Sequence, residues 1–392
     1  MLGIVVWGLA LGQALLITGN ILLVSVTALI GQSIAPQGLA TVPVALQFLG
    51  LMSSTLPAAL LMGRLGRKKG FLLGNVVGVI GAGLAFYAVS ESLFLLFCLS
   101  TFLLGIAIGF GQQYRFAATE HAPSHKAPQA ISLIMGAGVI AAVLGPNMAI
   151  WFEYLFPDVQ YLGAFAVLFV LYVLTTLLIY FLPLKPLSVD ERASSPRSYG
   201  QLLRQPPLIG AIAAGAIGYG VMVLIMTATP LAMHSGGFKF GDTAIVIQWH
   251  VLGMFLPSFL TGKLISRFGS YAIIQLGCVL LLACIVINQL GQSYSIYMVA
   301  LILLGVGWNF TFIGATTLLT QCYEPADKAR VQGVNDLIVF SFSAAASVLA
   351  GYWHNLFGWE MLNLMMVPAI VVAMLALIVT QRRPIKEMSA LN

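Results

Sequence analysis

The chain consists of long apolar segments that are interrupted by short polar turns. Segments such as residues 71–90 and 161–183 run for about 20 residues without a charged side chain. A helix of that length is long enough to cross the hydrocarbon core of a bilayer. Only 8% of the residues are charged and 60% are hydrophobic, whereas soluble domains carry about 25% charged residues. The sequence therefore predicts an all-α membrane protein and excludes a water-soluble fold.

Twelve membrane-spanning helices are predicted from these segments. Sustained apolar runs exclude a transmembrane barrel, whose short strands alternate apolar and polar residues. The first residues lack a basic stretch and a cleavage site of small residues, so we expect them to begin a helix and not a signal peptide. Pro57 and Pro257 are expected to lie inside continuous helices. The predicted helices are residues 4–30, 41–63, 71–90, 93–117, 129–152, 161–183, 208–232, 243–262, 271–290, 295–320, 331–353 and 359–380.

Positive charge is concentrated in the loops that would lie on one side of the membrane. If the N-terminus is cytoplasmic, 16 of the 18 Lys and Arg residues fall in loops on that side. Because cytoplasmic loops carry an excess of Lys and Arg, we expect both termini in the cytoplasm. The longest basic run is Arg67-Lys68-Lys69, so the net charge of +6 does not indicate binding of nucleic acid.

Residues 184–207 form the longest hydrophilic run, which mixes charged residues with Ser and Pro. Such a composition buries little apolar surface and is typical of a solvated linker. We expect it to be a cytoplasmic central loop between two six-helix halves, residues 1–183 and 208–392, the second ending in a short cytoplasmic tail.

The two halves resemble each other in sequence. Short motifs recur in the same order at an offset of 200 to 203 residues, and even numbers of helices make the halves parallel repeats. The matching motifs are Arg64-Leu65-Gly66 with Arg267-Phe268-Gly269, Leu103-Leu104-Gly105 with Leu303-Leu304-Gly305, and Pro123 to Ala127 with Pro325 to Ala329.

This organisation resembles the major facilitator superfamily over the whole chain. In that family the turn after the second helix reads Gly-x-x-x-Asp-Arg-x-Gly-Arg-Arg/Lys and takes part in conformational gating. Gly63 stands here in place of the Asp, and we expect the basic residues of the turn to pair with helix C-termini. The residues that match the turn are Arg64, Gly66, Arg67 and Lys68 in the first half, and Arg267 and Gly269 in the second.

The helix at 129–152 carries Gly145-Pro146, which resembles the start of the family's antiporter signature. Ala149 and Ile150 replace the last two glycines of that signature. In physical terms the motif predicts close helix packing with a proline bend. The resemblance implies export, and the mid-helix Arg that the family often carries would fall at Thr101.

Ionisable side chains at membrane depth are costly, so each one is a candidate functional residue. Asp336 is interpreted either as a proton-coupling or gating carboxylate, or as a residue at a solvated helix start that pairs with Arg330. Arg115 either binds an anionic group of the substrate, pairs with Asp336, or extends to lipid headgroups. His250, flanked by Gln248 and Trp249, is a second candidate for proton coupling because imidazole titrates near neutral pH.

Glu120 is expected to be a solvated loop residue or a partner of Arg115. The resemblance implies that the first, second, fourth and fifth helices of each half line a central cavity. Polar and aromatic residues on those helices are candidates for substrate binding, although polar side chains also hold helices together. These candidates are Asn20, Gln47, Gln113, Arg115, Asn147, Thr227, Trp308 and Asn309, with Gln13 beside them.

Other classes of function lack support in the sequence. There is no nucleotide-binding loop, and the four cysteines are not spaced as metal ligands, so we expect neither a cofactor nor an enzyme. We expect a monomeric secondary transporter of the bacterial inner membrane that moves a small organic molecule by alternating access. Proton-coupled export is the first interpretation; uptake of a small solute, which can be anionic, by symport or facilitated diffusion is the alternative, and a membrane sensor is a remote one.

Overall fold

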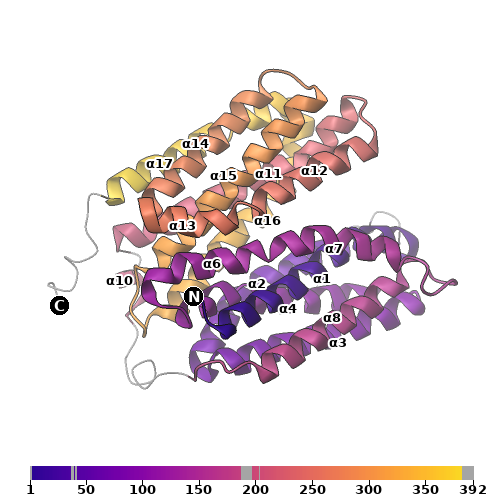
Figure 1. The fold of residues 1–392 in the computed structure, drawn as a ribbon. Coiled ribbons are helices and arrows are strands. Elements are labelled where there is room, and N and C mark those ends of the chain that lie inside the picture. Colours follow the sequence, from indigo (N-terminus) through magenta and orange to yellow (C-terminus); the bar gives the residue numbers. More distant parts are fainter. Residues whose placement is uncertain (1, 37–38, 40–41, 187–196, 203, 382–392) are drawn as a thin grey trace. The chain divides into compact units, whose positions relative to one another are not determined.

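The computed structural model describes residues 2–36, 39, 42–186, 197–202 and 204–381. Helices dominate these residues and no strand occurs among them (Figure 1). The centre of the expected loop at 184–207 and the C-terminal tail lie outside them. The helices are α1 Ile4–Ile34, α2 Val42–Leu65, α3 Arg67–Ser90, α4 Phe94–Gly111, α5 Tyr114–Glu120, α6 Ala127–Gly136, α7 Gly138–Trp151, α8 Leu162–Phe181, α10 Tyr199–Leu202, α11 Pro206–Ser235, α12 Phe240–Phe255, α13 Ser258–Phe268, α14 Ser270–Asn288, α15 Tyr294–Thr320, α16 Lys328–Leu364 and α17 Val367–Gln381.

Eleven helical segments of the described chain are long and apolar enough to cross a membrane. The last of them, Lys328–Gln381, has 54 residues, and a helix of that length would extend about 80 Å. A bilayer core is only about 30 Å thick. Gly358 interrupts the segment with a φ of 77°, so the segment supplies two spans. The predicted all-α membrane fold is confirmed.

Four of the expected helices are divided into two pieces. The helix expected at 359–380 is interrupted at Met365 and Met366, between α16 and α17. The helix expected at 243–262 breaks before Pro257 into α12 and α13, which corrects the expectation of a continuous helix. Proline cannot donate the backbone hydrogen bond, and its ring clashes with the preceding turn. The helix at 93–117 is interrupted at Gln112 and Gln113, and the helix at 129–152 is interrupted at Ala137.

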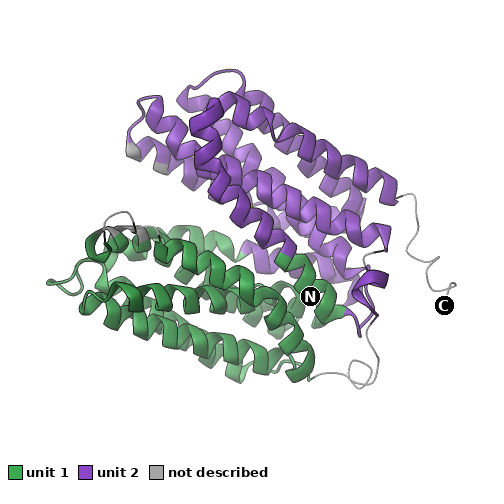
Figure 2. Ribbon diagram, turned by 180° about the vertical axis from the view of Figure 1, so that it is seen from behind, with its two compact units in different colours: residues 1–122, 137–195, 328–337 green, residues 123–136, 196–327, 338–392 purple. Residues whose placement is uncertain are grey.

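Two compact units make up the described chain (Figure 2). Unit 1 contains residues 1–122, 137–195 and 328–337, and unit 2 contains residues 123–136, 196–327 and 338–392. Helix α6 thus belongs to unit 2, whereas the first ten residues of α16 belong to unit 1. The limits of the two sequence halves remain a prediction from the repeat.

The internal repeat extends to the backbone. Gly66, before α3, has φ 88° and ψ 159°, and Gly269, before α14, has φ 83° and ψ 158°. A Cβ atom on Gly105 would lie 2.0 Å from the carbonyl oxygen of Gln47, and one on Gly305 would lie 2.5 Å from that of His250. Glycine therefore permits the same close helix crossing in both units, α2 with α4 and α12 with α15.

Candidate functional site

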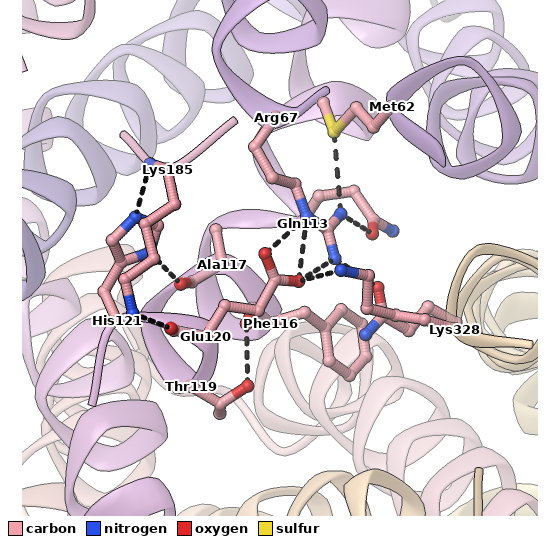
Figure 3. A network of polar contacts seen from close by, with 11 residues as sticks. Met62, Arg67, Gln113, Phe116, Ala117, Thr119, Glu120, His121, Lys185 and Lys328 are labelled. Atoms are coloured by element: carbon pink, nitrogen blue, oxygen red, sulfur yellow. Dashed lines mark hydrogen bonds and ion pairs between the residues drawn. The ribbon is translucent and has the colours of Figure 1, made fainter. Parts of the chain in front are cut away.

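A buried network of charged and polar groups lies within unit 1, around the first residue of α3 (Figure 3). Arg67 is only 5% exposed. Its Nη2 lies 2.6 Å from Oε1 of Glu120 and donates to Oε1 of Gln332 at 2.6 Å. Its Nη1 donates to Oε1 of Gln113 at 3.0 Å. The guanidinium thus joins α3, the end of α5 and the start of α16 through charge-assisted hydrogen bonds.

Glu120 is the carboxylate shared by two cations of this network. Besides Arg67, it pairs with Nζ of Lys328 at 3.2 Å, and its side chain is 22% exposed. Both expectations for Glu120, a solvated loop residue and a partner of Arg115, are wrong, because α5 continues to Glu120 and carries it to Arg67. The signal that sequence reasoning missed is Gly63: without an acid in the turn, a buried Arg67 needs a carboxylate from elsewhere.

Asp336 forms the second ion pair of the network. Its side chain is fully buried, and Oδ1 accepts a hydrogen bond from Nη2 of Arg115, which is 2% exposed. Asn335 donates to the same oxygen at 2.9 Å, and Gln113 donates to Oδ2 at 3.0 Å. The expected pairing of Arg115 with Asp336 is confirmed, and a solvated position for Asp336 is wrong.

Arg115 is held in place by two further neighbours on its own chain segment. Its Nη1 donates to Gln112 at 3.1 Å, and its guanidinium carbon lies 4.7 Å from the ring centre of Phe116. The side chain therefore does not extend to lipid headgroups, which corrects that alternative. Its charge is paired with the carboxylate of Asp336.

One face of α16 brings three network residues together. Lys328, Gln332 and Asp336 are spaced four residues apart, which places them on one side of a helix. Gln113 links the two ion pairs, because it accepts from Arg67 and donates to Asp336. Sequence analysis found Gln113 and Asp336 but missed Lys328 and Gln332, although their spacing was visible. A change of charge at Asp336 can therefore be transmitted to the Arg67–Glu120 pair.

The remaining residues of the basic turns are not part of the network's described contacts. Arg64 and Arg267 are exposed, and the guanidinium of Arg267 lies 5.2 Å from the ring centre of Phe268. Lys68 is half-buried, with Nζ 5.8 Å from the ring centre of Tyr180. Arg67 begins α3 and is not a loop residue, and it pairs with a side-chain carboxylate instead of a helix C-terminus. Both of those expectations for Arg67 were wrong.

In unit 2, His250 and Asn309 connect helices. His250 is fully buried on α12, and its Nδ1 lies 2.8 Å from the carbonyl oxygen of Leu301 on α15. Asn309 donates at 2.6 Å to both the carbonyl oxygen of Met254 and Oγ of Ser258. It also accepts from Thr261 at 2.6 Å. These bonds use both N–H donors of Asn309 and favour a role in joining α15 to α12 and α13.

The other substrate-binding candidates lie in different surroundings. In unit 1, Gln47 donates to Asn20 at 2.8 Å, so α1 and α2 present a joined pair of amides. Asn147 donates to the carbonyl oxygen of Val143, one turn back in α7, at 2.7 Å. Thr227 is partly buried on α11, and Trp308 is buried on α15 at 1% exposure.

The Gly145-Pro146 motif packs as expected. Pro146 lies inside α7, and a Cβ atom on Gly145 would lie 2.6 Å from the side chain of Ile21 on α1. The absence of a side chain at Gly145 therefore lets α7 pack closely against α1.

Comparisons with known proteins agree with the architecture. Residues 9–347 and 250–390 match the sequence model of the Major Facilitator Superfamily. The chain belongs to this superfamily. It is 39% identical over 373 residues to the riboflavin transporter RfnT of Brucella anthropi, with 94% of each chain covered. It is 32% identical over 348 residues to the uncharacterised MFS-type transporter YdeG of Bacillus subtilis, with 84% of this chain and 80% of that chain covered.

Solved structures of this superfamily share the fold. The fucose:proton symporter FucP of E. coli matches with a TM-score of 0.77 at 16% identity, covering 96% of this chain and 98% of the other. The human organic anion transporter MFSD10 matches with a TM-score of 0.79 at 16% identity, covering 95% and 98%. The protein is therefore a multi-pass membrane transporter of a small molecule, and it is not an enzyme.

Proposed function

We propose that this transporter takes up riboflavin, or a chemically similar uncharged heteroaromatic compound, across the bacterial inner membrane. The observation that carries the proposal is the 39% identity to a riboflavin transporter over 94% of both chains. The aligned region spans almost the whole length of both chains. We also propose that both termini lie in the cytoplasm, because Lys and Arg are concentrated in the loops on that side.

The pairing of the buried charges supports an uncharged substrate. Four charged side chains are almost inaccessible in the part of the chain that the structure describes: Arg67, Arg115, Asp327 and Asp336. Each of them forms an ion pair with an opposite charge. An ionic substrate would need a buried charge of opposite sign, and these charges are already neutralised. Riboflavin carries no net charge at neutral pH, whereas an organic anion does.

Protons are the proposed coupling ion, and Asp336 is the proposed site. Protonation of Asp336 would remove the negative charge that holds Arg115, and Gln113 would lose its ionised acceptor. Because Gln113 also contacts Arg67, the same proton would weaken the link between α3, α5 and α16. His250 contacts a backbone carbonyl and no charged partner in the described structure, so it is the second choice.

Export is the competing direction, and the close packing at Gly145-Pro146 is the observation that favours it. Direction can be decided in a bacterial strain that cannot synthesise riboflavin and has no uptake system for it. Uptake predicts growth on low external riboflavin and accumulation of labelled riboflavin that a protonophore abolishes. Export predicts no growth and faster loss of riboflavin from preloaded cells. The proposal fails if the protein is present in the membrane and neither uptake nor export of riboflavin is detected.

The role of Asp336 needs a matched control. Asp336→Asn is expected to abolish accumulation against a gradient while exchange of labelled for unlabelled riboflavin continues. Asp327→Asn removes another buried and paired carboxylate, which contacts Arg197 at 2.6 Å outside the network. It is expected to retain accumulation. If both variants accumulate riboflavin as the parent does, Asp336 is not the coupling site.

A further inference from the structure

Five aromatic side chains of unit 2 form one cluster around Tyr219. The ring of Tyr219 meets those of Trp308, Phe312 and Phe340 edge to face, with centroid distances of 5.3, 5.2 and 5.6 Å. Trp308 stacks on Phe312 with an interplanar angle of 12°, and Phe255 lies 5.9 Å from Trp308. The cluster draws on α11, α12, α15 and α16, four helices for which sequence analysis predicts a position at the central cavity. Tyr219 is partly exposed, whereas the other four rings are buried.

The backbone around Trp308 is fixed from several sides. A Cβ atom on Gly307 would lie 3.0 Å from the side chain of Leu281 on α14. One on Gly305 would lie 2.5 Å from the carbonyl oxygen of His250 on α12. Asn309 is bonded to α12 and α13. The neighbours of Trp308 in the sequence therefore hold α15 against α12, α13 and α14. The ring of Trp308 is held in place before any ligand arrives, which reduces the entropy lost on binding.

Tyr219 is positioned by a close approach of α11 to α15. A Cβ atom on Gly218 would lie 2.6 Å from Oγ1 of Thr311. Because Thr311 follows Trp308 by one turn, the same contact fixes both aromatic rings relative to each other.

The fold itself does not require this cluster. At the repeat offset of 200 residues, Trp308 corresponds to Ile108 and Phe312 corresponds to Gln112. The matching crossing of α2 and α4 in unit 1 is thus built without a tryptophan. Furthermore, Nε1 of Trp308 is buried and has no hydrogen-bond partner in the described part of the chain. Buried donors of this kind are rare in native proteins and need an explanation.

We propose that Tyr219 and Trp308 form the subsite for the planar ring of the substrate. The face of Tyr219 stacks on the ring, and the indole N–H of Trp308 donates to a carbonyl oxygen at the ring's edge. The ligand class is a flat, uncharged heteroaromatic compound with carbonyl acceptors, which the flavin ring system satisfies. This inference rests on the proposed function and adds the residues that recognise the ring.

The test measures binding of riboflavin, and of lumichrome, which has a related tricyclic ring and no sugar alcohol chain. Purified protein is titrated into each compound while the flavin fluorescence is recorded. Trp308→Phe keeps an aromatic ring and removes the N–H, and it is expected to raise both dissociation constants about 10-fold. Tyr219→Leu is expected to raise them about 5-fold, whereas Tyr219→Phe binds as the parent does because the ring face is retained.

Trp359 supplies the matched control. It lies in the same unit, is 4% exposed, and its Nε1 also has no partner in the described structure. It follows Gly358 in the last predicted helix, which the family resemblance places outside the cavity. Trp359→Phe is expected to leave both dissociation constants unchanged. Size-exclusion profiles and melting temperatures of all variants show that they are folded.

The outcomes separate the two proposals. If the parent protein binds neither compound and does not transport riboflavin, the proposed function fails. If the parent binds riboflavin and Trp308→Phe binds as tightly as Trp359→Phe, the ring subsite is wrong and the function stands. Should Tyr219→Leu fail to fold, the comparison of Trp308→Phe with Trp359→Phe still decides the subsite.

Discussion

The buried pair of Arg115 and Asp336 allows a quantitative test of the network. Asp336→Asn removes the carboxylate and leaves a guanidinium that is 2% exposed with Gln112 and the ring of Phe116 as neighbours. Loss of one partner from a buried ion pair costs about 3–5 kcal/mol. The lower end, about 3 kcal/mol, applies here because the amide oxygen of Asn can still accept from Arg115. In large domains 1 kcal/mol corresponds to about 2–4 °C, so the melting temperature should fall by about 6–12 °C.

The double variant Arg115→Met/Asp336→Leu removes both charges together. Replacement of a buried pair by apolar residues of similar size is often neutral. The double variant should therefore recover most of the melting temperature that the single variant loses. It should not regain accumulation of riboflavin if Asp336 is the proton site, as we propose. Stability and transport are thus predicted to respond in different ways.

Thermal unfolding of the purified variants in one detergent at one scan rate is the appropriate assay, because membrane proteins unfold irreversibly and the midpoint depends on the rate. Asp327→Asn is the reference, since its partner Arg197 is 27% exposed and the loss should be smaller. A double variant that melts at or below the single variant would refute the reasoning, as would a single variant that melts within 1 °C of the parent.

Three further outcomes are expected. Glu120→Gln should lower the melting temperature less than Asp336→Asn does, because Glu120 is 22% exposed and solvent reduces the contribution of the pair; an equal loss would contradict this order. Gly66→Ala should reduce the yield of folded protein in membranes, since φ of 88° costs about 1–3 kcal/mol with a side chain. Gly105→Ala should be more damaging than Gly83→Ala in the same yield assay, because the nearest atom would lie at 2.0 Å from the new Cβ in one case and 3.7 Å in the other.

The global fold could be predicted because it depends on properties that are local in sequence. Helix length and apolar content determine which segments span a membrane, and these are read directly from the chain. The repeat was also visible, and Gly66 and Gly269 share a backbone conformation because the same motif forms the same turn. The pairing of Arg115 with Asp336 followed from the cost of leaving two opposite charges buried and separate.

Other features depend on which helices become neighbours, and sequence patterns alone do not give this. Glu120 was assigned to a loop because its own segment is polar, although α5 carries it to Arg67. Asn309 was chosen for substrate contact, yet it bonds to α12 and α13, which only the helix crossing brings within reach. The break at Pro257 was missed because neighbouring helices decide whether a proline is tolerated.

The two units share a backbone plan but differ in chemistry. At the repeat offsets, Arg67 corresponds to Ser270, Arg115 corresponds to Ala315, and Asp336 corresponds to Ile134. The charged residues of the unit 1 network therefore stand where unit 2 has uncharged residues, so the repeated fold does not need the charges. In the aromatic cluster it is unit 2 that differs, since Trp308 stands where unit 1 has the aliphatic residue Ile108. Because neither set is needed for the helix crossings, both fit the two roles that we propose: proton coupling in unit 1 and recognition of a planar ring in unit 2.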